Sequence, residues 1–118
     1  MKEKINIEYL KVRKTKHTGM AFTLVNDKTA ENMIVVAPGS NMESNMFLAK
    51  KTKKIIVNAN AVLMQLEIPL ETVKYVIDLA YQFKHVVSIL KSCTGGSKLG
   101  KDVLEKVTLP YPIVAKWN

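Results

Sequence analysis

The carboxylate of Glu67 is the side chain best placed to do chemistry in this sequence. It follows an apolar run of strand length, Ala61 to Leu66, and precedes Pro69, which starts a long helical pattern. Open α/β sheets bind ligands at the carboxyl ends of their strands, where a carboxylate can accept hydrogen bonds from ligand hydroxyl groups. The alternative is a structural role, because an acid near the start of a helix complements the helix dipole. The pattern by itself slightly favours this alternative.

Other reactive groups are present, but the sequence favours a structural role for each. Thr94 to Ser97 (Thr-Gly-Gly-Ser) could cradle a phosphate, yet it lacks the glycine and lysine spacing of a P-loop, so we predict a connector. Cys93 has no readable base partner, and we predict a plain loop cysteine. His17 and His85 stand in unrelated contexts. We therefore predict neither a catalytic residue nor a metal site from these groups.

The segments that must position these groups alternate between strand and helix patterns. Met20–Val25 and Asn32–Ala37 are rich in β-branched and aromatic residues, and Asn26–Thr29 carries turn residues, so together they predict a β-hairpin. Ile5–Val12 predicts a connector leading into a short strand. The further predicted elements are a helix over Ser44–Lys54, a strand over Ala61–Leu66, a helix over Pro69–Phe83, a strand over Val86–Leu90, a loop over Cys93–Gly100, a short helix over Asp102–Val107 and, because of its prolines, an extended segment from Leu109 to Val114.

Two of these elements carry a burial prediction. The near-continuous apolar run Ala61–Leu66 is typical of a strand covered on both faces. Lys74 and Asp78 are spaced as an i,i+4 pair on the polar side of the long helix. Its predicted buried stripe consists of Leu70, Val73, Val76, Ile77 and Ala80.

The order of elements predicts an α/β fold, with a parallel sheet, right-handed crossover helices and a protruding β-hairpin. We expect a single domain over residues 1–118, with the hairpin region at about 5–41 and the sheet portion at about 42–109.

The chain is basic, with a formal charge of +8 over 118 residues, and 47% of its residues are hydrophobic. One basic cluster is Lys11, Arg13, Lys14 and Lys16, and another is Lys50, Lys51, Lys53 and Lys54. A polyanion-binding role is one interpretation, but neither cluster has interleaved aromatic residues, so we favour a solvated surface and consider nucleic-acid binding unlikely.

No run approaches a membrane span, no signal peptide is readable, and one cysteine excludes an internal disulfide, so a reducing, cytoplasmic setting is expected.

From about Ile5 to Leu90 the sequence resembles the ribokinase (PfkB) family of carbohydrate kinases. Thr18–Val25 is similar to the first long strand of that family's lid, and Glu31–Asn41 to its returning strand and closing Gly-x-Asn. The most specific segment is Asn60–Glu71, Asn-Ala-Val-Leu-Met-Gln-Leu-Glu-Ile-Pro-Leu-Glu. The resemblance implies a partial ribokinase-like fold in which the hairpin is the lid.

The resemblance also implies a site. The family transfers the γ-phosphoryl group of ATP, with Mg²⁺, to a hydroxyl of a sugar such as ribose. Glu67 matches its substrate-contacting glutamate, and this match outweighs the structural alternative. Ala21, Thr23 and Val36 match lid positions that cover the sugar or line its rim. Because lids pair between subunits in this family, the hairpin is also the expected homodimer contact.

The departures from the family pattern limit what we expect of this chain alone. The family's N-terminal sugar-binding Asp and Gly-Gly motif are absent, as is the C-terminal Gly-x-Gly-Asp segment that supplies the anion hole and catalytic base. Lys91–Thr94 stands where the family reads Asn-Pro-Ala-Pro. We therefore expect a truncated kinase segment without activity of its own, and doubtful ATP and Mg²⁺ binding. The alternative is a non-catalytic module for β-flap dimerisation or polyanion binding.

Overall fold

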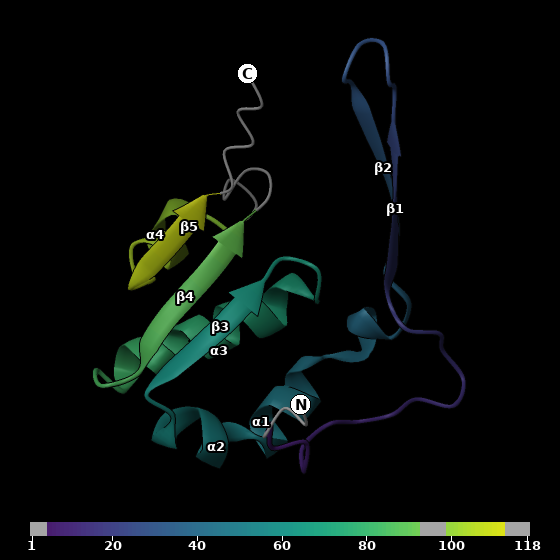
Figure 1. Ribbon diagram of the computed structural model, residues 1–118. Coiled ribbons are helices and arrows are strands. Elements are labelled where there is room, and N and C mark those ends of the chain that lie inside the picture. Colours follow the sequence, from purple (N-terminus) through teal and green to yellow (C-terminus); the bar gives the residue numbers. More distant parts are fainter. Residues whose placement is uncertain (1–4, 93–98, 113–118) are drawn as a thin grey trace. The chain divides into compact units, whose positions relative to one another are not determined.

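The computed structural model describes residues 5–92 and 99–112 (Figure 1). The chain divides into two compact units, Met1–Asn41 and Met42–Asn118, which are described one at a time. Cys93 and the loop Thr94–Ser97 lie outside the described residues, as do residues 113–118.

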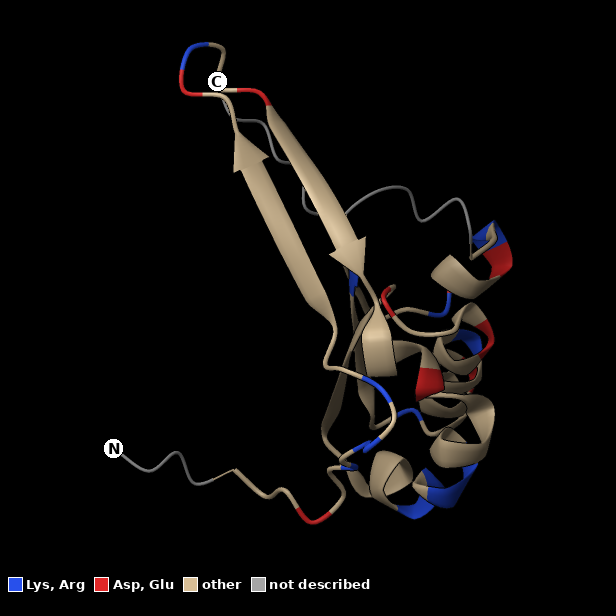
Figure 2. Cartoon of the chain, turned by 90° about the vertical axis from the view of Figure 1, so that its right-hand side faces the viewer, with Lys and Arg blue, Asp and Glu red and all other residues tan. Residues whose placement is uncertain are grey.

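The first unit is built on the predicted hairpin. Strands β1 (Met20–Val25) and β2 (Asn32–Ala37) pair antiparallel, with Met20 opposite Ala37 and Val25 opposite Asn32. The side chain of Asn26 accepts hydrogen bonds from the backbone N–H groups of Lys28 and Thr29, which closes the turn locally. Figure 2 shows that charged residues are confined to the tip and absent from both strands. The hairpin prediction is therefore confirmed.

The segment before the hairpin differs from the prediction. No strand forms between Ile5 and Gly19, where the described side chains are largely exposed and no neighbouring strand offers backbone partners. At the base of the hairpin Gly39 adopts φ +52°, and the Ser40 N–H donates to the His17 carbonyl at 2.9 Å. This contact ties the two ends of the hairpin together. A short 3₁₀ helix, η1 (Gly39–Glu43), follows.

The predicted single helix over Ser44–Lys54 is wrong, because two short helices form instead. Helix α1 (Met46–Lys51) starts at Asn45, whose side chain accepts a hydrogen bond from the Leu48 N–H, and helix α2 (Lys53–Asn58) follows directly. Thr52 lies between them and its hydroxyl donates to the carbonyls of Leu48 and Ala49. Such local hydrogen bonds compete with the helix ladder and end α1 there.

The second unit contains a three-stranded parallel sheet in the order β3-β4-β5 (Figure 1). Its strands are β3 (Ala61–Gln65), β4 (Val87–Ser92) and β5 (Leu109–Pro112). Helix α3 (Leu70–Gln82) connects β3 to β4, and the short helix α4 (Lys101–Leu104) connects β4 to β5. The α/β fold with a parallel sheet, crossover helices and a hairpin is therefore as predicted.

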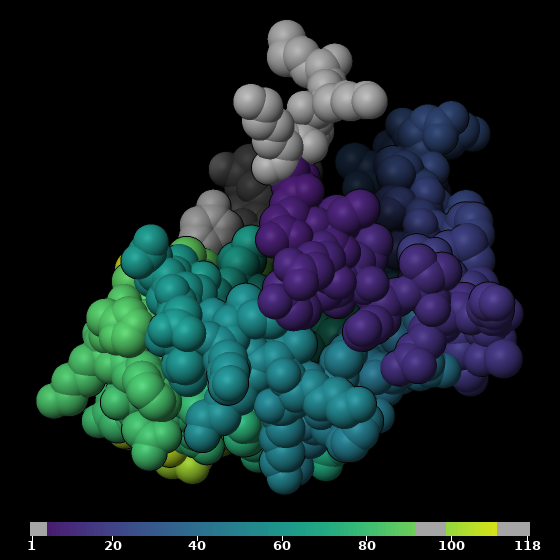
Figure 3. Space-filling view, turned by 90° about the horizontal axis from the view of Figure 1, so that it is seen from below, coloured from purple at the N-terminus to yellow at the C-terminus, as the bar shows by residue number. Residues whose placement is uncertain are grey.

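The core lies on one face of this sheet. Met64 and Leu90 point into it and meet Val73 and Ile77 of α3 and Val103 of α4. Of the predicted α3 stripe, Leu70 is half-buried and the other four residues are buried. On the polar side of α3, Asp78 pairs with Lys106 rather than with Lys74. Viewed from below, α1 and α2 (blue to teal) adjoin the green residues that follow α3 in one surface of this unit (Figure 3).

The prediction that β3 is covered on both faces is wrong. Its alternate residues Ala61, Leu63 and Gln65 are exposed, and Leu63 retains 70% of its accessible surface. The register places Leu63 beside Ile89 and Ile89 beside Leu109, which is 54% exposed. We call the row Leu63, Ile89 and Leu109 the open sheet face. Both crossover helices pack on the opposite face, so nothing in the described part of this unit covers it.

None of the helices in the described residues has the length and apolar character that a membrane crossing requires.

Candidate functional site

Glu67 lies just beyond the carboxyl end of β3, as the sequence predicts. Strand β3 ends at Gln65 and helix α3 begins at Leu70, and a turn connects them (Figure 1). Glu67 belongs to this turn, and its side chain is exposed. The acid in the first turn of α3 is Glu71. Because dipole effects fall off within the first turn, Glu71 is the residue that complements this helix. Glu71 is thus better placed than Glu67 for the structural role considered above.

The strand register adds two polar groups that the sequence reading did not include in the site. Gln65 pairs with Lys91, the residue before the last of β4, at the same carboxyl edge of the sheet. Gln65 is exposed and Lys91 is half-buried. The predicted strand ends at Leu90 and so does not include Lys91; the available signal is that neighbouring parallel strands place their carboxyl ends at the same edge. The edge therefore offers an amide and an ammonium group close to the turn that carries Glu67.

The hairpin register brings the three predicted lid residues onto one face. Ala21 lies directly opposite Val36, and Thr23 lies opposite Ile34. Directly opposed residues of an antiparallel pair share a face, and so do alternate residues of one strand. We call the surface formed by Ala21, Thr23, Val25, Ile34 and Val36 the Thr23 face. All five side chains are exposed, so this face is open to a ligand. Glu67 belongs to the other unit.

The other face of the hairpin is wholly apolar. It consists of the pairs Met20–Ala37, Phe22–Val35 and Leu24–Met33, which we call the Phe22 face. Phe22 is 58% exposed and Leu24 is 62% exposed. An isolated two-stranded hairpin is marginal in water, and contiguous exposed apolar surface marks an interaction site.

The described residues do not form a magnesium site by themselves. Mg²⁺ is usually bound through carboxylates together with the phosphates of a substrate. In residues 5–92 and 99–112 no group of three or more His, Cys, Asp and Glu side chains is arranged to hold a metal ion. No step of a reaction can therefore be derived through a metal held by these residues alone.

Comparison with known proteins gives a consistent picture. No family model matches the chain. It is 32% identical over 103 residues to the ribokinase of Schizosaccharomyces pombe, covering 87% of this chain and 31% of that protein. It is 28% identical over 110 residues to the ribokinase of Haemophilus influenzae, covering 93% and 35%. A solved structure of Arabidopsis thaliana ribokinase complexed with ribose and ATP aligns with a TM-score of 0.63 and 25% identity, covering 83% and 31%.

A parallel sheet with a carboxylate at its carboxyl edge, together with an antiparallel hairpin, is an α/β architecture of the carbohydrate-kinase type. The chain is a segment of the ribokinase family. It spans about a third of the length of the curated relatives that it matches.

Proposed function

We propose that this chain is the sugar-contacting and sugar-covering part of a ribokinase-type kinase, which transfers the γ-phosphoryl group of ATP to ribose with Mg²⁺. Glu67 accepts hydrogen bonds from sugar hydroxyl groups at the carboxyl edge of β3. The Thr23 face of the hairpin covers the sugar, with Ala21 and Val36 at its rim.

The observation that supports this proposal is that Glu67 lies at a ligand-binding edge of the sheet and also matches the substrate-contacting glutamate of the ribokinase family. Glu67 is exposed at the sheet edge where α/β folds bind ligands, and it is not the acid of the first helical turn. Independently, Ala21, Thr23 and Val36 fall on one hairpin face although they come from two strands. A shared face is what residues that cover one ligand require.

The chain by itself does not catalyse the transfer. Phosphoryl transfer needs positioned charge stabilisation and an oriented nucleophile. Within the described residues there is no carboxylate cluster for the metal. We infer that catalysis, and the binding of ATP in position for transfer, require the segments that the longer relatives carry.

Titration of the chain with ribose, followed by protein NMR, tests the sugar site. Glu67→Gln keeps the shape but removes the charge, and a hydrogen bond to a charged group contributes ~1.5–3 kcal/mol, so we expect affinity to fall by roughly tenfold or more. Glu71→Gln, an equally exposed neighbour in the first turn of α3, is the matched control and should leave affinity unchanged. Equal effects of both substitutions contradict the role of Glu67. Release of ADP by the pure chain with ribose and ATP contradicts its inactivity.

A second proposed role is homodimerisation through the hairpin, supported by the exposed Phe22 face. Pairing two copies would bury apolar side chains that are otherwise in water. We expect sedimentation to show a dimer whose stability is insensitive to salt. Phe22→Lys should dissociate it, whereas Lys28→Gln at the hairpin tip should not. A monomer at all concentrations contradicts this role, and steeply salt-dependent binding of nucleic acid would favour a polyanion-binding module instead.

A further inference from the structure

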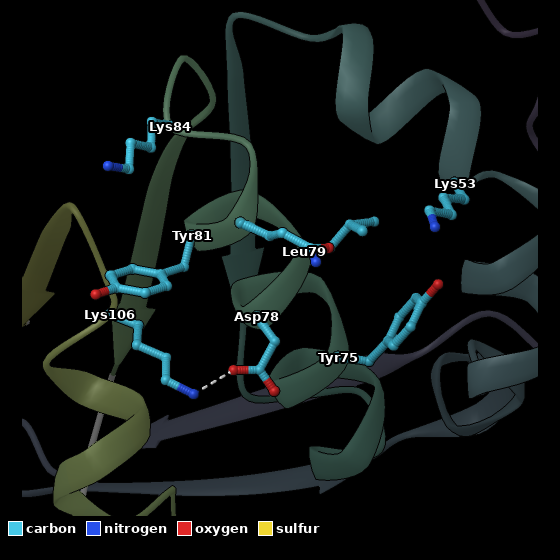
Figure 4. Close-up of a pocket in the computed structure, with 8 residues that line it drawn as sticks. Lys53, Tyr75, Asp78, Leu79, Tyr81, Lys84 and Lys106 are labelled. Atoms are coloured by element: carbon cyan, nitrogen blue, oxygen red, sulfur yellow. Dashed lines mark hydrogen bonds and ion pairs between the residues drawn. The ribbon is translucent and has the colours of Figure 1, made fainter.

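A basic groove crosses the outer surface of helix α3, away from the core. It encloses about 560 Å³, within the usual range of ligand pockets, and is open to solvent (Figure 4). Its floor includes the buried residue Leu79, and its walls come from α2, α3, the turn after α3 and the turn after α4. Its lining residues are Lys53, Tyr75, Asp78, Leu79, Tyr81, Gln82, Lys84 and Lys106. We call it the α3 groove.

The charge of the groove is positive and mostly uncompensated. The only acid of its lining, Asp78, accepts a hydrogen bond from Lys106 Nζ at 2.6 Å. This bond raises the pKa of Lys106, which favours its ammonium form, and the ammonium group lies against the Asp78 side chain. Lys53 and Lys84 form no ion pair with any described residue. Two ammonium groups are therefore free to bind an anion.

The two free lysines stand at different ends of the groove. Lys53 begins α2, and the Tyr75 hydroxyl is directed toward its ammonium group (Figure 4). Lys84 follows the end of α3 and lies on the side of Tyr81 (Figure 4). Tyr75 and Tyr81 are six residues apart on α3, about 9 Å along its axis, and their rings point to different sides of the helix (Figure 4). The two ends are therefore farther apart than this axial distance, so a single phosphate contacts one end and an extended anion is needed to contact both.

We propose that the α3 groove binds a linear oligophosphate, either free or as the triphosphate of a nucleotide. Lysines bind phosphate as point charges, and the tyrosine hydroxyls and the Gln82 amide can donate further hydrogen bonds to phosphate oxygens. The neutralised Lys106–Asp78 pair lies between the ends and keeps the acid from repelling the ligand. The groove lies on α3 and not at the sheet edge that carries Glu67, so this site is independent of sugar binding.

Calorimetric titration of the full chain with tripolyphosphate at an ionic strength of ~0.15 M tests the proposal, and inorganic phosphate, ATP and single-stranded DNA serve as comparison ligands. Exposed charge pairs each contribute modestly, so the double variant Lys53→Gln/Lys84→Gln should weaken tripolyphosphate binding by about tenfold. The double variant Lys11→Gln/Lys28→Gln removes the same charge from the first unit and should change affinity by less than about twofold. Circular dichroism verifies that each variant keeps its secondary structure.

Each outcome decides the proposal. It is supported if tripolyphosphate binds at least about tenfold more tightly than phosphate and if only the groove variant loses this affinity. If ATP binds as tightly as tripolyphosphate, the triphosphate group is sufficient for binding. If ATP binds more tightly and Tyr81→Ala removes this difference, the ligand of the groove is a nucleotide. The proposal is overturned if the unmodified chain does not bind tripolyphosphate. It is also overturned if inorganic phosphate binds as tightly as tripolyphosphate or if both double variants lose affinity equally. Tighter binding of single-stranded DNA than of tripolyphosphate overturns it too.

Discussion

Adjacent residues of β3 provide a direct test of the open sheet face. Leu63 and Met64 are neighbours in one strand, share its backbone hydrogen bonding and point to opposite faces. Leu63 is 70% exposed, whereas Met64 is 7% exposed and belongs to the core. Substituting each with alanine therefore compares an uncovered face with a covered face while strand and register stay fixed.

The expected magnitudes differ clearly. Full burial of a leucine side chain contributes ~1.5–3 kcal/mol, and at 70% exposure less than a third of this remains, so Leu63→Ala should cost roughly 0.5–1 kcal/mol. Met64→Ala removes a side chain packed among Val73, Ile77 and Leu90 and leaves a cavity, so it should cost about 2–5 kcal/mol.

Urea unfolding followed by far-ultraviolet circular dichroism measures both costs as shifts in the transition midpoint. The slope of the transition must stay the same in the variants, because a changed slope signals a different end state. Measurements at two protein concentrations separate folding from association, since a face covered by a second copy gives concentration-dependent stability.

Equal losses of unfolding free energy in Leu63→Ala and Met64→Ala would contradict an uncovered sheet face. Such a result would show that the open sheet face is covered in solution, either by residues outside the described ranges or by another molecule. Leu63→Lys sharpens the comparison, because a lysine is tolerated on an uncovered face and strongly destabilising on a covered one.

Three further predictions concern other parts of the chain. Gly39→Ala should destabilise the hairpin by roughly 1–3 kcal/mol, because Gly39 has φ +52° and an added Cβ would clash with the His17 carbonyl oxygen. Faster hydrogen exchange of the β1 and β2 amides is the expected sign. Ala30→Gly should have the opposite effect and stabilise the turn by about 1 kcal/mol, since Ala30 holds φ +55°; slower exchange of the same amides is the expected sign, and faster exchange contradicts it. The pKa of Lys106 is raised by its hydrogen bond to Asp78, so the contribution of Lys106 protonation to stability is present below the unfolded value of about 10.5 and is lost as pH rises through the folded pKa. The difference in denaturation midpoint between wild type and Lys106→Met should therefore shrink as pH rises above about 10.5.

The sequence predicted those elements whose signals are local. The hairpin bounds follow from the turn at Asn26–Thr29 and match the structure, and the stripe of α3 predicts its buried face. The break at Thr52 was missed, because a threonine inside a lysine-rich helical pattern gives no warning that its hydroxyl will bond to the preceding turn. The pairing of Leu109–Pro112 as strand β5 was also missed, since its prolines indicate an extended chain but not a neighbour.

The candidate site shows the same division between local and non-local information. The position of Glu67 could be predicted, because a strand end and a helix start are both readable around it. The shared face of Ala21, Thr23 and Val36 follows from the register of an antiparallel pair, once the turn is known. The pairing of Gln65 with Lys91 depends on which strand lies beside β3, and that choice is made by the crossover and not by either segment alone.

The incorrect burial prediction for β3 and the apolar surfaces of the hairpin have one physical cause. Both segments carry more apolar side chains than the described chain covers: Leu63 and Leu109 on the sheet, Phe22 and Leu24 on the hairpin. Parallel sheets are normally covered on both faces, and a bare two-stranded hairpin gains little from its own packing. Each uncovered surface therefore marks a place where the sequence is suited to a partner, and both lie beside elements of the proposed sugar site. We therefore expect a partner to cover these surfaces in solution.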